Sequence, residues 1–214
     1  FVGAFPAGVT GSRSGSAPRG RLLHASPHLM FILLVIFLFA FGQSGPETFA
    51  YVFLAENLGA GNDLIGLLGA VSQLAALPAY HVADRLLQRW GPIATMAISL
   101  GLHLLGWGGY ALIPWPALAL PLSALEGLGR ALYLVSMVIL LGECGQPQRA
   151  ATDQMLAQMT VPGLARMVAQ PIGGWLFDTW GGRSLFAFDA VLCTLAAGLL
   201  LARADKLRTS NRSG

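Results

Sequence analysis

Apolar runs of roughly 20 residues recur along the chain, and this is the length that a helix needs to cross the hydrocarbon core of a membrane. With 55% hydrophobic and 11% charged residues, the composition is also far less charged than that of soluble domains, in which about 25% of residues are charged. We therefore expect an all-α membrane protein whose residues 28–202 form a six-transmembrane-helix bundle. The predicted spans are Leu29–Phe53, Leu64–Val82, Pro92–Ile113, Pro116–Leu141, Met155–Phe177 and Leu185–Leu201.

Both ends of the chain differ from this apolar region. Residues 1–27 are rich in Gly, Ser, Pro and Arg and contain no acidic residue, which predicts a basic cytoplasmic linker. Residues 203–214 are polar and basic and are expected to form a cytoplasmic C-terminal tail. Because the chain starts at Phe1 and not at Met, we expect it to be a fragment of a longer protein.

The basic residues predict how the bundle is oriented. Cytoplasmic loops of membrane proteins carry an excess of Lys and Arg. Only Arg183 falls on the side opposite the chain ends, so both termini are expected in the cytoplasm, with the bundle in the cell membrane or an organelle inner membrane. The basic residues on the side of the termini are Arg13, Arg19, Arg21, Arg85, Arg89, Arg149, Arg203, Lys206, Arg208 and Arg212.

Several classes of function lack their sequence signals. The Arg residues lie at segment ends and form no stripe with aromatic residues, so nucleic-acid binding is not expected. Cys144 and Cys193 lie in different environments, which argues against a disulfide. No metal site is expected because the His residues lack Cys partners and ligand spacing, and no phosphate-binding loop or other cofactor motif is present. An ion gradient is then the expected energy source.

Several motifs resemble those of the major facilitator superfamily of transporters. The stretch Arg149–Gln154, the pair Pro162-Gly163 and the run Gly173–Arg183, with its Gly-Gly-Trp-Leu-Phe-Asp pattern, resemble the region from the tenth to the twelfth span. Ala83–Gly91 is similar to the Asp-Arg loop between spans eight and nine, although Tyr80 and the late Gly91 depart from its glycine positions. Tyr51–Leu67 resembles the passage from span seven to span eight in the branch with lactose permease and the nucleoside and aromatic-acid proton symporters.

This resemblance implies both a fold and a function. The chain would be the C-terminal half of a twelve-span fold with a 3+3 inverted repeat, completed by a missing N-terminal six-span half. Pro78 and Pro171, followed by Asp84 and Asp178, are repeated features that agree with such an inversion. The implied function is secondary active, proton-coupled transport of a small-molecule substrate across the lipid bilayer, with Asp84, Arg85 and Asp178 in loop and gating motifs, and no enzyme activity.

Glu126 and Arg130 are the first candidates for the transport site. Ionisable residues inside a span are costly and need a partner, a wet cavity or a function. Their i,i+4 spacing predicts an ion pair on one helix face, which Tyr133 continues towards the cytoplasm. In the transporters that the chain resembles, this span couples protonation to substrate binding, and Glu126 takes a position where that branch often has His. The alternative is a purely structural pair.

Gln43 and Glu47 lie in a segment predicted to bend the first span. Pro46 removes an intrahelical hydrogen bond there, and Gly42 and Gly45 allow a kink. Transporters build binding sites from such interrupted helices, so both polar residues are candidates for substrate or coupling sites. The alternative is a simple kink that leaves Glu47 near the outer interface.

On the fifth span, polar groups recur every four residues at Gln158, Pro162, Arg166 and Gln170. Such a stripe is not expected to face lipid. Arg166 is predicted either to attract an anionic substrate or to pair within the bundle. His103 and Asp189 are single polar residues that we expect to be satisfied inside the bundle, and His103 is also a candidate site residue.

Two further patterns predict packing and anchoring. The small-residue pairs Gly66/Ala70, Gly127/Ala131 and Ala169/Gly173 have the spacing that permits close helix contacts. Trp107, Trp115, Trp175 and Trp180 fall near predicted outer span ends, as in an aromatic belt.

Two other functions compete with transport. Gly42–Gly45 matches the G-x-S-G motif of rhomboid-type intramembrane proteases, with Ser44 as nucleophile and His81 or His103 as base. That family places its Ser at the start of a late span, whereas Ser44 lies within the first. The other alternative is a stand-alone, non-transporting accessory subunit.

Overall fold

The structure is a computed structural model that describes residues 27–144 and 149–203. These residues are helical and contain no strand, which confirms the all-α class. Apart from residues 27 and 203, the predicted linker and tail lie outside the described residues. The elements are α1 Pro27–Leu58, α2 Asn62–Tyr110, a 3-10 turn Pro116–Leu118, α3 Ala119–Cys144, α4 Ala150–Met155, a π-helical turn Leu156–Thr160, α5 Val161–Trp180 and α6 Gly182–Ala202.

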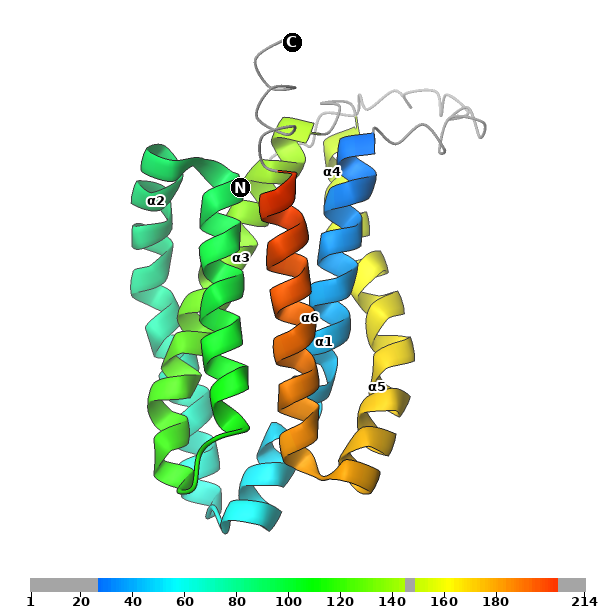
Figure 1. The fold of residues 1–214 in the computed structure, drawn as a ribbon. Helices are drawn as coiled ribbons and strands as arrows, with labels where there is room; N and C mark the ends of the chain where they lie inside the picture. The colour runs from blue at the N-terminus through cyan, green and yellow to red at the C-terminus, as the bar shows by residue number, and fades with distance from the viewer. Residues whose placement is uncertain (1–26, 145–148, 204–214) are drawn as a thin grey trace, which may run out of the picture.

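Helix α2 contains a sharp reversal at Gly91. This residue has φ 80° and ψ 172°, a conformation that is essentially restricted to glycine. The two arms on either side of Gly91 lie next to each other and run in opposite directions (Figure 1). They correspond to the second and third predicted spans. The prediction of an Asp-Arg loop is wrong, because Asp84 and Arg85 lie on the helix. The chain changes direction at Gly91.

A second turn of the same kind joins α5 to α6. Gly181 has φ 81° and ψ 165°, close to the torsions of Gly91. Its backbone amide donates to the carbonyl of Phe177, which closes the end of α5. Each of these two connections therefore depends on a glycine, because the absence of a Cβ allows these backbone torsions.

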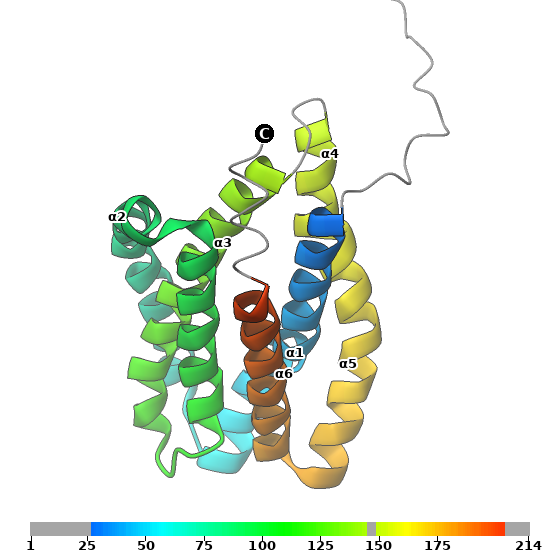
Figure 2. The ribbon, with the colours of Figure 1, turned by 45° about the horizontal axis from the view of Figure 1, so that its top comes forward.

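The helices form a bundle in which segments that follow one another along the chain alternate in direction (Figures 1 and 2). The start of α1 and the end of α6 lie at the same end of the bundle in both views. Four helices are long and apolar enough to cross a membrane: α1, α2, Pro116–Cys144 and α6. The chain is an integral membrane protein by this criterion.

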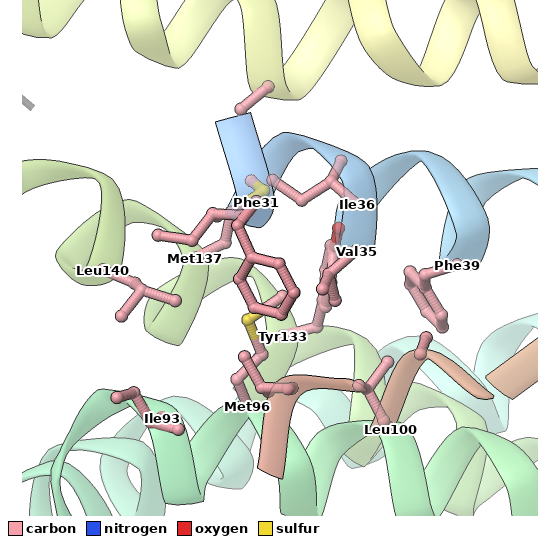
Figure 3. Packing of buried hydrophobic residues seen from close by; sticks show 14 of the residues in the cluster. Phe31, Val35, Ile36, Phe39, Ile93, Met96, Leu100, Tyr133, Met137 and Leu140 are labelled. Carbon is pink, nitrogen blue, oxygen red and sulfur yellow. The ribbon is translucent and has the colours of Figure 1, made fainter. Parts of the chain in front are cut away.

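The two larger of three apolar clusters among the described residues form the cores of the bundle. The first core lies at the end that contains the start of α1. It packs Ile36 and Phe39 of α1 against Met96 of α2 and Tyr133 and Met137 of α3 (Figure 3).

The second core lies at the opposite end of the bundle and includes Phe53, Trp107, Tyr110 and Phe186. Trp107 is only 7% exposed and stacks on Phe186, so the expectation that it anchors the protein at the membrane surface is wrong. Large aromatic side chains fill the second core, and Trp107 is part of it.

Small residues set the closest helix contacts, but not all at the expected pairs. A Cβ on Gly127 would overlap the backbone carbonyl of Ser72, so α2 and α3 touch there. Ala169 and Gly173 are also buried. Gly66, in contrast, has open space around it, and its predicted packing role is wrong within the described residues.

The glycines of α1 serve a different purpose from the expected one. A Cβ on Gly42 would lie 2.7 Å from Oδ1 of Asp189, and one on Gly45 would lie 2.6 Å from Leu185. Both positions therefore let α6 approach α1 closely. The backbone of α1 stays helical through Pro46, so the chain is not unwound there.

Candidate functional site

Between the two cores, polar side chains from α1, α2, α3 and α5 line two cavities. The first cavity has a volume of about 260 Å³ and the second about 370 Å³. Glu47, Arg130 and Arg166 line both, so the cavities meet at these three charged side chains. Other lining residues are Gln43, His103, Tyr133 and Gln158 in the first cavity and Tyr51, Ser72, Trp107 and Glu126 in the second. All seven predicted substrate or coupling residues thus line one or both cavities.

Glu126 and Arg130 form the ion pair that their spacing predicts. Arg130 donates from Nε to Oε1 of Glu126 over 3.1 Å, and its Nη2 donates to the same oxygen. The other carboxylate oxygen accepts a 2.7 Å hydrogen bond from Oγ of Ser72 on α2. The Glu126 side chain is 6% exposed and that of Arg130 is 40% exposed, so the carboxylate is covered and the guanidinium is not.

Sequence reasoning missed Ser72. A hydroxyl inside an apolar span beside Gln73 was the available signal, but nothing local pairs it with a residue 54 positions away. The close contact of α2 with Gly127 brings it to Glu126.

Glu47 and Arg166 form a second ion pair, which links α1 to α5. Nη2 of Arg166 lies 2.9 Å from Oε2 of Glu47. The side chains are 50% exposed for Arg166 and 27% exposed for Glu47, so here too the guanidinium is the more exposed partner. Glu47 lines both cavities, which favours a site role over the alternative of a side chain at the outer interface.

His103 sits at the wall of the first cavity among aromatic rings. Its Nδ1 lies 2.9 Å from the carbonyl oxygen of Ser99, and the ring meets Phe39 edge-on with centroids 4.8 Å apart. Phe39 also packs on Tyr133 at 4.5 Å. Nε2 of His103 is buried and has no hydrogen-bond partner among the described residues, so the expectation of a satisfied histidine is wrong.

Asp189 is fully buried but does not line either cavity. Its Oδ1 lies 3.6 Å from Sγ of Cys193, which donates to it, and its Oδ2 has no partner among the described residues. The carboxyl group lies against Gly42 at the contact of α6 with α1. The expectation that it is satisfied within the bundle is therefore also wrong.

The polar stripe of the fifth predicted span faces the first cavity over most of its length. Gln158, Pro162 and Arg166 line this cavity, and Gln170 is exposed outside it. Gln158 lies in the π-helical turn that precedes α5. The wider turn is a local irregularity of the kind often found at functional sites.

The model of the MFS_1 like family matches residues 17–188. The chain belongs to this family. No curated protein matches the sequence. The family match places the chain in the major facilitator superfamily and indicates a membrane transporter of the major facilitator type.

In this member of the MFS_1 like family, the predicted gating residues lie apart from the cavities. Asp84 and Arg85 are exposed in the last turns before Gly91, and Asp178 is exposed near Gly181. Within the described part of the chain, none of the three enters a salt bridge. Their predicted gating role therefore concerns a different part of the protein from solute binding.

The geometry does not favour a protease in this member of the family. Ser44 is 1% exposed in the middle of α1, and its Oγ has no hydrogen-bond partner among the described residues. His103 directs Nδ1 at Ser99, and His81 is exposed on α2. A serine nucleophile needs a base within hydrogen-bond reach, and neither histidine is bonded to Ser44.

Proposed function

We propose that this chain is the C-terminal six-span half of a twelve-span, proton-coupled transporter that moves a small solute with an anionic group by alternating access. The single observation that carries the proposal is the convergence of two ion pairs, Glu126–Arg130 and Glu47–Arg166, on the shared wall of two cavities. Charged residues inside membrane helices are expensive and mark substrate or ion pathways. The branch with lactose permease and the nucleoside proton symporters is part of the proposal.

The six-span count is supported by the length and shape of α2. A straight helix of its 49 residues would measure about 74 Å, more than twice the roughly 30 Å of membrane hydrocarbon. The reversal at Gly91 divides it into two arms, each long enough to cross. The fifth span would be formed by α5 with the preceding π-helical turn, where a polar stripe replaces part of the apolar surface.

The inverted repeat is supported by the two glycine turns. Gly91 and Gly181 follow the second and fifth proposed spans and have nearly the same torsions. Both are preceded by a proline within the helix, Pro78 or Pro171. Two triplets of helices related by inversion would place these equivalent turns on opposite faces of the membrane.

An anionic solute is supported by which charges are exposed. In each ion pair the carboxylate side chain is less exposed than the arginine: 6% against 40% for Glu126 and Arg130, and 27% against 50% for Glu47 and Arg166. Arginine offers five N–H donors in a fork that matches carboxylate or phosphate groups, and Arg166 donates only one of them to Glu47. A solute anion can therefore bind Arg166 through its free N–H groups.

Proton coupling is assigned to Glu126. Its carboxylate is paired with Arg130 and accepts a hydrogen bond from the hydroxyl of Ser72. A helix movement that separates the pair would leave a buried charge without a cation, and protonation would remove that cost. Uptake and release of the proton would then follow the two conformations of the transport cycle.

The proposal includes partners and orientation. A missing N-terminal six-span half would close the open side of the cavities, and both termini would lie in the cytoplasm. The solute, protons and the lipid bilayer are the proposed partners. Nucleic acid, a metal or an organic cofactor has no place in this mechanism, and no enzyme activity is proposed.

Replacing the coupling carboxylate tests the function. The full-length protein is reconstituted in liposomes, and uptake of small organic acids is measured with and without an inward proton gradient. We expect Glu126→Gln to abolish stimulation by the gradient while exchange of solute across the membrane persists, because binding remains but no proton is carried. Glu56→Gln, at an exposed acid of α1, is the matched control and should retain full stimulation.

Unchanged gradient-driven uptake in Glu126→Gln would remove Glu126 from the coupling step. Absence of any organic-acid uptake by the wild-type protein would instead contradict the proposed anionic solute.

A further inference from the structure

We propose that His103 and Trp107 form a second, uncharged subsite that binds a group of the solute able both to donate and to accept hydrogen bonds, such as a primary carboxamide. This inference rests on the proposed function and deepens it by naming the solute class, a small organic acid with such a group at its other end. The two residues lie one helical turn apart on α2, and each lines one of the two cavities that meet at Arg130 and Arg166.

The first observation is that both side chains hold a buried polar atom without a partner. Nε2 of His103 and Nε1 of Trp107 have no hydrogen-bond partner among the described residues. His103 is 1% exposed and Trp107 is 7% exposed. Buried polar groups are nearly always hydrogen-bonded, so two orphan atoms on neighbouring turns at cavity walls indicate a ligand that completes them.

The two nitrogen atoms have opposite hydrogen-bonding roles. A carbonyl oxygen only accepts, so Nδ1 of His103 must carry the hydrogen that it shares with Ser99, and Nε2 of the neutral ring is then an acceptor. The indole Nε1 of Trp107 is only a donor. Together the pair presents one acceptor and one donor, and the complementary group must supply one donor and one acceptor.

Both rings are held in place before any solute arrives. Nδ1 and Cε1 of His103 lie against Gly129, and Phe39 packs edge-on against the ring. Trp107 lies against Tyr110 at 5.3 Å and stacks on Phe186 at 6.3 Å between centroids. Fixed rings favour a bound group of defined geometry because little side-chain freedom is lost on binding.

The backbone spacing of the two residues is compatible with a carboxamide. Positions i and i+4 lie about 6 Å apart along a helix axis. The nitrogen and oxygen of a primary amide diverge, and with hydrogen bonds of about 2.9 Å they bridge partners separated by roughly 5 to 6 Å. The amide NH2 would donate to His103 and its carbonyl would accept from Trp107, while the carboxylate at the other end binds Arg166.

Three isosteric acids separate the contributions of the two side chains. Succinamate ends in a carboxamide, levulinate replaces its NH2 with CH3, and pentanoate also lacks the carbonyl. Uptake by the full-length protein in liposomes is measured as kcat/KM for each acid, and the series is repeated with one and two additional methylene groups. We expect the wild-type protein to prefer the amide over the ketone, at one chain length, by about tenfold or more.

The variants should remove one preference each. His103→Phe should erase the preference for the amide over the ketone and leave that for the ketone over the alkyl acid. Trp107→Phe should erase the preference for the ketone over the alkyl acid. Trp115→Phe, the same change at a tryptophan that is 70% exposed, is the matched control and should leave both ratios unchanged. Uptake of pentanoate close to the wild-type value shows that a variant is folded.

Two results would overturn the inference. Equal kcat/KM values for amide, ketone and alkyl acid at every chain length in the wild-type protein would mean that ordered water alone satisfies the two atoms. Preferences that persist unchanged in both variants would place the recognition elsewhere. If no acid of any kind enters the liposomes, the proposed function fails instead, and the two failures are therefore distinguishable.

Discussion

The two arginine residues of the site differ in how exposed their acidic partner is, and therefore in the cost of replacing each arginine. Arg130 neutralises Glu126, whose side chain is 6% exposed, whereas Arg166 neutralises Glu47, whose side chain is 27% exposed. A buried charge that loses its partner is strongly destabilising, and a more exposed one is partly solvated. The two ion pairs therefore contribute differently to stability although both line the same cavities.

We expect Arg130→Gln to lower the free energy of unfolding by about 3 kcal/mol, because Glu126 loses its cation in a buried position. Arg166→Gln should cost about 1 kcal/mol or less. Both are measured by denaturant unfolding of the purified protein in detergent micelles.

The double variant Glu126→Gln/Arg130→Gln is the control, since it removes both charges and should recover most of the loss. Equal destabilisation by the two single Arg variants would contradict the exposure argument.

At this scale, the sequence predicts contacts within one helix better than contacts between helices. The pair Glu126–Arg130 follows from helical spacing alone. Glu47 and Arg166 are 119 residues apart, and their contact depends on how α1 and α5 pack, which no local pattern specifies. The orphan atom of His103 was equally unpredictable, because partnership depends on every neighbouring helix.

Among the described glycines, Gly127 leaves the least room for a side chain, because α2 lies directly against α3 there. A Cβ on Gly127 has no room beside the Ser72 backbone, and backbone cannot move aside as a flexible side chain does. The same contact positions the Ser72 hydroxyl on Glu126. Helix packing and site geometry are thus coupled at one crossing point.

Gly127→Ala is expected to lower the free energy of unfolding by about 1 to 3 kcal/mol, as overpacking does elsewhere. Gly66→Ala, on an exposed face with open space, should be neutral in stability or stabilise by up to about 1 kcal/mol. Thermal and denaturant unfolding in detergent compares the two variants with the wild-type protein. A destabilised Gly66→Ala beside an unaffected Gly127→Ala would contradict this assignment of the packing face.

The apolar runs predict where the helices lie in the sequence, but they predict less well which face of a helix packs against a neighbour. The predicted spans fall on helical segments, but the second and third share α2, and the fifth covers the end of α4, the π-helical turn and most of α5. The helix α1 extends further, to Leu58, and the third predicted span ends earlier, at Tyr110. Small residues at Gly66 and Gly127 have the same spacing pattern in sequence, yet only Gly127 meets a neighbour. Periodicity states which residues share a face and not which helix that face touches.

For the molecule as a whole, segments that are expected in the cytoplasm lie at one end of the bundle. The start of α1, the turn at Gly91 and the end of α6 lie at one end of the bundle (Figure 1). Arg85 and Arg89 lie at that end, just before the turn at Gly91. The turn at Gly181 and the residues around Trp115 lie at the other end.

Cysteine labelling from outside intact cells tests this arrangement. In a full-length protein with Cys144 and Cys193 replaced by Ser, Trp115→Cys and Trp180→Cys should react with an impermeant thiol reagent. Arg89→Cys and Arg149→Cys should react only after the cells are permeabilised, because basic residues are retained in the cytoplasm. Reaction of position 149 in intact cells would reverse or disprove the proposed topology.

In both ion pairs the acidic side chain is more buried than the arginine, and this difference has a consequence for how a charged solute approaches the site. The four charges cancel in sum, but the negative groups lie deeper than the positive ones. The cluster is therefore an electric dipole whose positive pole faces the cavity space. Under the proposed transport function, the field of this dipole would attract an anionic molecule to the cavities before any hydrogen bond forms.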